Sequence, residues 1–108
     1  MPRIEQHSPT DLQGQALAAE QEAQAAKAQR DRELNDLRWM LSDARGRRIV
    51  RRLFAFTGVD RTSFHSSGSQ MAFNEGQRNV GIFLKAEVLD AKPESYIEML
   101  TEHKADAT

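Results

Sequence analysis

Large apolar side chains are concentrated in the last two thirds of this chain. Residues 37–100 hold nearly all of them, whereas the first 36 residues offer alanines and, apart from Met1, only four larger ones: Ile4, Leu12, Leu17 and Leu34. Within 37–100 the apolar positions recur at helical spacing. The pattern therefore predicts an all-α protein, with a long N-terminal helix followed by a small bundle of about three helices.

The first 36 residues are predicted to form a polar arm and an alanine-rich, extended helix. Ser8-Pro9 closes the arm, and Thr10 or Asp11 can cap the helix that follows. From 15 to 38 the residues are strong helix formers without glycine or proline, and the helix should continue toward Leu41 as a rod of about 40 Å. Such a helix is either solvated or packed against other copies, because it is too poor in large side chains to fold alone.

Residues 37–104 are predicted to be the compact domain. Its first helix should begin at Asp43 or Ala44, be capped by Ser42 or Asp43, and end near Phe56 before Gly58. Its inward stripe is expected to be formed by Ile49, Val50, Leu53 and Phe54.

The next helix should run from Ser69 or Gln70 to Leu89, with one broad apolar face formed by Phe73, Val80, Phe83, Leu84 and Val88. Gly76 and Gly81 lie inside it, and each costs about 1 kcal/mol relative to alanine. They indicate tight packing against another backbone or a large ring, such as Trp39 or Phe54, and Trp39 is expected in the core.

A last helix should begin at Pro93, where a missing amide proton does no harm. Its apolar side is formed by Tyr96, Ile97, Met99 and Leu100. The tail from Lys104 onward, residues 105–108 in particular, is predicted to fray.

Charge is distributed unevenly, although the net charge is only −1. The segment 45–61 holds six arginines against one aspartate, while both flanking segments are acidic. Five of these arginines surround the apolar stripe of the helix predicted to end near Phe56: Arg45, Arg47, Arg48, Arg51 and Arg52. A local field of this kind suggests a phosphate-bearing or acidic partner.

Three interpretations of the arginines remain open. They can pair within the chain with carboxylates such as Asp36, Asp43, Glu75 and Glu87. They can contact nucleic acid, or they can dock on an acidic protein surface, which a neighbouring copy of this chain could itself supply.

Catalysis finds little support in the residues. The three histidines, His7, His65 and His103, are scattered and lack metal-pairing spacing. His65 lies beside serines, but no positioned acid or oxyanion motif accompanies it. We expect no enzyme, no bound metal and no cofactor.

The chain contains no cysteine, which excludes a disulfide framework and cysteine-ligated metal, and fits synthesis in a reducing cytoplasm. No apolar run approaches the length of about 20 residues that a membrane-spanning helix needs. A secretion signal is not evident either.

Several segments together resemble a known family: residues 36–48, Leu53-Phe54, Gly58-Val59, Ser63-Phe64 and 73–81. The family consists of small proteins of tailed bacteriophages, and its namesake is a Bordetella podophage protein encoded among the head genes. The similarity covers about 34–102. Its recurring segments also contain Arg78, and they supply a set of signature residues: Trp39, Asp43, Gly46, Glu75, Gly76, Asn79 and Gly81.

The resemblance implies a role in the virion or its assembly. We expect a non-enzymatic structural protein, either a multi-copy adaptor at the portal or head–tail junction or an internal ejection component. Its partners would be portal, tail or ejection proteins and further copies of itself, with no membrane involved. The alternative is a small DNA-binding protein that uses the arginine-rich helix during packaging or early infection.

Overall fold

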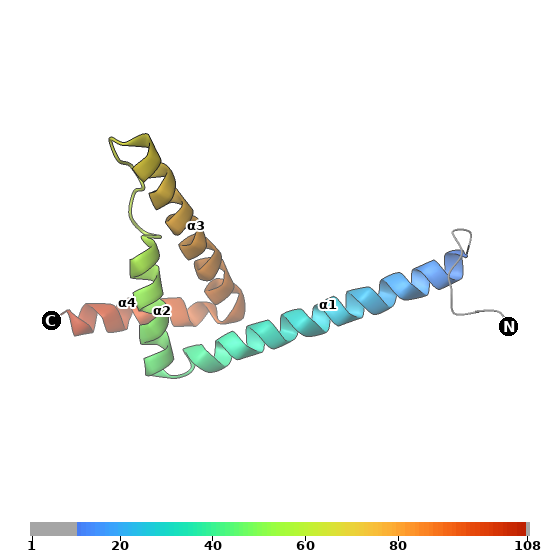
Figure 1. Ribbon diagram of the computed structural model, residues 1–108. Coiled ribbons are helices and arrows are strands. Elements are labelled where there is room, and N and C mark those ends of the chain that lie inside the picture. Colours follow the sequence, from blue (N-terminus) through green and yellow to red (C-terminus); the bar gives the residue numbers. More distant parts are fainter. Residues whose placement is uncertain (1–10, 108) are drawn as a thin grey trace. The chain divides into compact units, whose positions relative to one another are not determined.

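The computed structural model describes residues 11–107, which form four helices (Figure 1). They are α1 (Leu12–Leu41), α2 (Ala44–Thr57), α3 (Gly68–Ala91) and α4 (Pro93–Asp106). No strand occurs in this part of the chain. The predicted fold class, a long N-terminal helix followed by three more, is confirmed. The predicted polar arm, 1–9, lies outside the described residues.

The chain divides into two units, 1–33 and 34–108. In the first, Asp11 accepts a hydrogen bond from the amide of Gly14 at 2.9 Å and so caps the start of α1. Two ion pairs at helical spacing, Lys27–Asp31 and Arg30–Glu33, lie along its surface. Its large apolar side chains, Leu12 and Leu17, are exposed. This segment is therefore held by helix propensity and local pairs.

The second unit begins with the last two turns of α1 and contains α2, α3 and α4 packed on one another. Its core is one small cluster: Leu41, Val50, Phe54, Val59, Val88 and Met99, with Leu37, Met40, Leu84 and Tyr96 packed against it. Burial of each such side chain stabilises the fold by about 1.5–3 kcal/mol. Because the cluster is small, a large part of the apolar surface stays uncovered.

The ends of the helices follow the predicted signals. Asp43 caps α2 through a 2.8 Å bond from the amide of Arg45, and Gly58 ends α2 in the left-handed conformation at φ 68°. Pro93 occupies the first turn of α4 as predicted, whereas α3 begins one residue earlier than expected, at Gly68, with Ser67 as a cap that was not predicted. α4 continues past Lys104 as far as Asp106, so the first residues of the expected frayed tail are helical.

Of Gly76 and Gly81, the two glycines of α3 that were predicted to pack tightly, only one lies in a tight contact. A Cβ at Gly81 would collide with Thr57 and Val59, so α3 approaches α2 closely there. The nearest atoms belong to the side chains of these two residues, and not to another backbone or to the ring of Trp39 or Phe54, the alternatives that we expected. Gly76 has no neighbouring atom within 4 Å, and the prediction that it packs tightly is wrong.

Several apolar residues that were expected inside are exposed. Trp39, predicted in the core, keeps 76% of its surface accessible. On α2, Val50 and Phe54 are buried, whereas Ile49 and Leu53 are nearly half exposed. The contact between two packed helices is narrower than the apolar stripe of either helix. Residues at the edges of the stripe therefore stay exposed. On α3 and α4 the same is true of Phe73, Val80, Phe83, Ile97 and Leu100.

Candidate functional site

The arginines of α2 point in two directions. At 100° per residue, Val50 and Phe54 mark the core side of the helix, with Arg47 and Arg51 on one flank. Arg45, Arg48 and Arg52 lie on the far side, away from the core. The five side chains therefore form an inner pair and an outer group of three.

The inner pair binds α4. Arg47 donates to both carboxylate oxygens of Glu102, at 2.8 Å from Nη2 and 3.0 Å from Nε, and to the carbonyl of Leu41 at 2.9 Å. Arg51 donates to Asp106 at 2.8 Å. Hydrogen bonds from Arg47 lower the pKa of Glu102, and Glu102 in turn raises the pKa of Arg47. These arginines clamp α2 to α4, and the carboxylates involved differ from those we expected.

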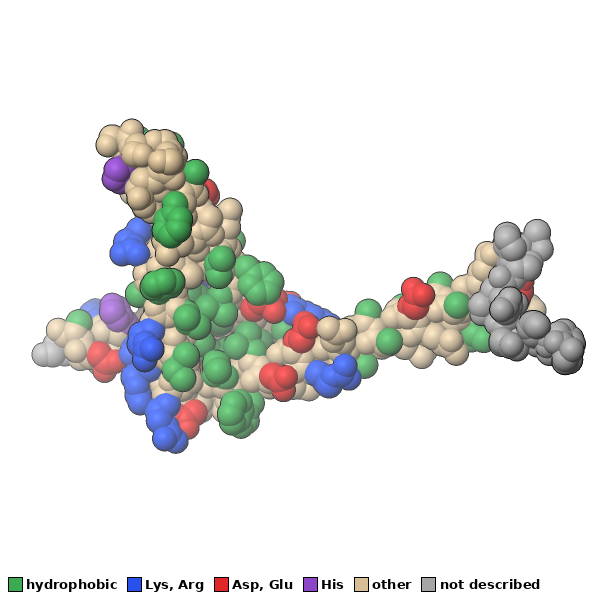
Figure 2. Space-filling view, in the orientation of Figure 1, with side chains coloured by type: hydrophobic (Ala, Val, Ile, Leu, Met, Phe, Trp, Pro, Cys, Tyr) green, Lys and Arg blue, Asp and Glu red, His purple; other side chains and the backbone are tan. Residues whose placement is uncertain are grey.

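The outer group is accessible. Arg48 and Arg52 are exposed, and within 11–107 neither has an ion pair. Arg45 is 3.6 Å from Asp43, the residue that caps α2. The hydrogen bond from the amide of Arg45 lowers the pKa of the Asp43 carboxyl, so this cap is charged at neutral pH. Three guanidinium groups are thus presented to solvent by one helix face, and Figure 2 shows basic side chains along α2.

The outer arginines adjoin an apolar strip. Ile49, Leu53 and Phe56 are exposed and occupy the helix flank next to Arg45 and Arg52. We call Arg45, Arg48, Arg52, Ile49, Leu53 and Phe56 the outer α2 face. Trp39 and Arg45 also line one shallow cavity near the start of this helix. The face therefore combines charge with apolar surface.

Arg78 lies elsewhere. It contacts Glu75 of its own helix at 3.4 Å, so Glu75 does not bind an arginine of α2 as we had considered. Arg78 lines a polar pocket with Arg61, near the C-terminal end of α2. Sequence spacing gave no signal for this neighbourhood, because Arg61 lies in the loop after α2 and Arg78 in α3, and they line one pocket only because α3 packs back on α2.

The other signature residues have distinct places. Gly46 is buried against the carbonyl of Met40, where a Cβ would not fit. Asp43 is the cap, and Gly81 is the contact between α2 and α3. Trp39, Gly76 and Asn79 are exposed. The signature is therefore partly structural and partly on the surface.

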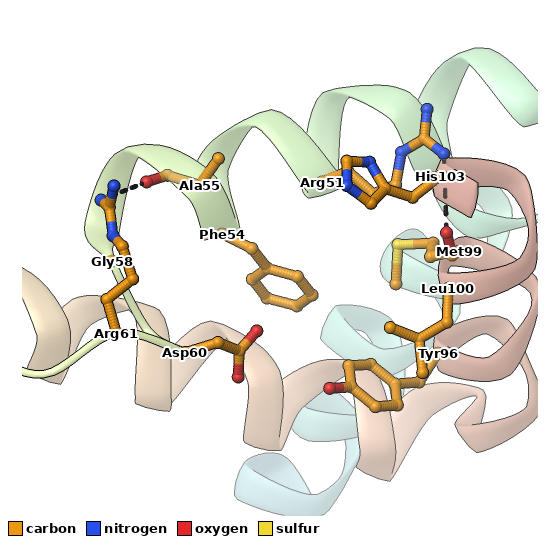
Figure 3. A pocket seen from close by; sticks show the side chains of 10 residues that line it. All are labelled: Arg51, Phe54, Ala55, Gly58, Asp60, Arg61, Tyr96, Met99, Leu100 and His103. Carbon is orange, nitrogen blue, oxygen red and sulfur yellow. Dashed lines mark hydrogen bonds between the residues drawn. The ribbon is translucent and has the colours of Figure 1, made fainter. Parts of the chain in front are cut away.

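An apolar pocket of about 250 Å³ lies between α2 and α4 (Figure 3). The rings of Phe54 and Tyr96 line it, and their centroids are 6.4 Å apart. His103 lies in α4 and lines the pocket with Arg51. The sequence did not indicate this pocket, because its walls come from helices separated by about 40 residues.

His65, which lies beside serines in the sequence, has a structural role. Nδ1 of His65 accepts a hydrogen bond from the amide of Ser67 at 2.9 Å and so shapes the loop before α3. Within the described residues, no three histidine, aspartate or glutamate side chains are grouped as metal ligands. In the same part of the chain, no helix is both long enough and apolar enough to span a bilayer.

Comparison with known proteins agrees with the resemblance. No curated protein and no solved structure shows significant similarity to the chain. A family model, described as Bbp19-like phage protein, matches residues 37–101. The match covers more than half of the chain and spans the core, the outer α2 face and the glycine contact of α3. The chain therefore belongs to the Bbp19-like phage protein family.

Proposed function

We propose that the chain is a non-enzymatic structural protein of the phage particle. It acts in several copies, as an adaptor at the portal or head–tail junction or as an internal ejection component, and its partners are portal, tail or ejection proteins and its own copies. Membership of a phage protein family supports a role in a phage. The observation that carries the proposal is the outer α2 face.

The composition of that face fits a protein partner. Ile49, Leu53 and Phe56 need an apolar surface to cover them, and Arg45, Arg48 and Arg52 need acceptors beside it. Aromatic and arginine side chains dominate the binding energy of protein interfaces. The matching partner surface is an apolar groove with an acidic rim.

The primary test is the composition of purified particles of the phage that encodes this chain. We expect quantitative mass spectrometry to find the chain in multiple copies per particle. Particles that have released their genome distinguish the two versions: an adaptor stays with the empty particle, whereas an ejection component leaves with the DNA. Absence of the chain from mature particles rejects the proposal.

A matched pair of variants tests the outer α2 face. Arg52→Glu reverses a charge on it, and Arg32→Glu makes the same change on an exposed arginine of the first unit. Repulsion from an acidic rim should reduce incorporation of Arg52→Glu into particles about tenfold or more. Arg32→Glu should be incorporated normally. Equal incorporation of both variants contradicts docking through this face.

The alternative function is binding of DNA backbone, which the exposed Arg48 and Arg52 favour. Phosphate contact releases counterions, so affinity for duplex DNA should fall steeply with salt, and Arg48→Gln with Arg52→Gln should flatten that dependence. Leu53→Ser separates the two functions. It should weaken protein docking and leave DNA affinity unchanged, because phosphates make no use of an apolar side chain.

A further inference from the structure

α3 carries an exposed apolar stripe that its own unit does not use. Phe73, Gly76, Val80 and Phe83 follow one another at intervals of three, four and three residues, which places them along one line of the helix. Phe73, Val80 and Phe83 are 61%, 60% and 65% exposed. Figure 2 shows apolar side chains on the surface over α3. We call these four residues the α3 stripe.

The core of the unit lies on another side of α3. Gly81 and Val88 face α2 and α4, and Leu84 packs beside them. Gly76 has open space around it, although glycine inside a helix is unfavourable and this one makes no close contact within the described residues. A small residue between exposed rings leaves a depression into which a side chain of another helix can fit.

The α3 stripe is complementary to itself. When two copies of α3 lie antiparallel and cross at position 78, Phe73 faces Phe83 of the second copy and Gly76 faces Val80. Each phenylalanine of one copy thus meets a phenylalanine of the other, and Val80 of each copy meets Gly76 of the other. An isologous contact of this type is the commonest in symmetric oligomers.

Charges do not oppose this pairing. The charged residues of α3 near the crossing are turned away from the stripe: Arg78 contacts Glu75, and Lys85 contacts Asp60 at 3.1 Å. Glu87 lies near the end of the stripe, and its counterpart on the second copy would be about 27 Å away along the axis, because each residue rises about 1.5 Å. The contact surface around the crossing is therefore uncharged.

We propose that the α3 stripe is the contact between two copies of this chain, paired antiparallel through α3. This inference rests on the proposed multi-copy function and adds to it by naming a second copy of the chain as the partner of the α3 stripe. The two phenylalanines and the valine of each copy are about three-fifths exposed, so they contribute roughly 700 Å² to the contact in total, which is below the size of most specific interfaces. A contact of this size binds weakly by itself, and its apparent affinity rises when several copies are held together.

Sedimentation equilibrium over a range of concentrations measures the pairing. The wild-type chain should dimerise, and Val80→Glu should raise the dimer dissociation constant at least about tenfold, because it places an uncompensated carboxylate in the contact. Ile97→Glu is the matched control: Ile97 is 61% exposed on α4, outside the stripe. This variant should dimerise like the wild type. Circular dichroism establishes that both variants stay helical.

Cross-linking tests the register, since the chain has no cysteine of its own. Gly76→Cys and Val80→Cys should form a mixed disulfide when combined, because positions 76 and 80 face each other across the contact. Each variant alone should cross-link poorly: two copies of position 80 would be offset by about 6 Å along the axis, in addition to the separation of the helices.

Each outcome bears on the pairing. A wild-type chain that stays monomeric at the highest soluble concentration overturns it, and so does equal weakening by Val80→Glu and Ile97→Glu. Disulfides within each single variant that exceed the mixed product overturn the antiparallel register. A monomeric chain that is still found in multiple copies in particles would reject this contact and leave the proposed function standing.

Discussion

The three glycines of the family signature have different neighbours, although all lie within helices. Gly46 lies against the carbonyl of Met40, and Gly81 lies against Thr57 and Val59, so neither position has room for a side chain. Gly76 has no atom within 4 Å of the place where a Cβ would be. Helix propensity alone disfavours all three. Packing therefore accounts for two of them, and the third needs another explanation.

Alanine substitutions at two of these positions should have opposite effects on stability. In the unpaired chain, Gly76→Ala should raise the free energy of unfolding by about 0.5–1 kcal/mol, because alanine is the better helix former and no other residue within 11–107 lies near the site. Gly81→Ala should lower it by about 1–3 kcal/mol, because the new methyl group forces α3 away from Thr57. Urea unfolding followed by circular dichroism measures both. Equal signs would contradict the packing described for α3.

At the scale of the elements, α2 is the helix that organises the second unit. Its core side buries Val50 and Phe54, one flank clamps α4 through Arg47 and Arg51, and the outer α2 face is exposed. Arginines that look equivalent in the sequence therefore differ in their surroundings: two pair with α4, and three face solvent. The division follows from where α4 packs.

The clamp between α2 and α4 should make stability depend on pH. Glu102→Gln should lower the free energy of unfolding by about 1–3 kcal/mol at pH 7, since Arg47 is left half-buried without its main counter-charge. The pKa of Glu102 is lowered in the folded state. Its contribution is therefore complete above the unfolded pKa of about 4.3 and is lost as the pH falls through the folded value.

The difference between wild type and Glu102→Gln should accordingly shrink between pH 5 and the acid limit of the folded state, as measured by urea unfolding at several pH values. Glu98→Gln is the matched control on the same helix, because Glu98 is 3.8 Å from Arg47 and more exposed. It should change stability by less than about 0.5 kcal/mol. A difference between wild type and Glu102→Gln that does not vary with pH would exclude this clamp.

At the scale of the whole molecule, the chain contains two units of unlike character. The segment 12–33 is a helix without a core of its own, whereas 34–107 has a compact core and holds almost all of the family match at 37–101. Features shared with the family are therefore features of the second unit. The first unit lies outside the match.

Limited proteolysis should distinguish the two units. Trypsin should cut first after Lys27, Arg30 or Arg32, because a helix with few tertiary contacts opens locally at little free-energy cost. Arg47 and Arg51 should resist cleavage, since they are held by Glu102 and Asp106. Mass spectrometry of the early products gives the order. Early cleavage at Arg47 or Arg51, with 27–32 intact, would contradict the division.

Much of the secondary structure could be predicted because its signals are local. Asp43 and Gly58 mark the ends of α2 by their own hydrogen bonds and backbone conformation, and Pro93 marks the start of α4. An uninterrupted run of strong helix formers, without glycine or proline from 15 to 38, indicated α1. The segments that resembled the phage family were likewise read directly from the residues, and the family match confirms them.

The candidate site could be predicted only as a set of arginines on one helix. Periodicity shows which residues share a face, but it does not say which face another helix covers. That choice depends on contacts between residues about 50 positions apart, such as Arg47 with Glu102.

Local signals were enough to place the four helices, the ends of α2 at Asp43 and Gly58 and the basic character of α2, because each depends on residues within one or two turns. Contacts between distant segments leave Trp39 exposed, make Gly81 and not Gly76 the close contact, and turn three arginines outward. The physical reason is that a small core covers one side of each helix, and the packing of distant segments selects which side.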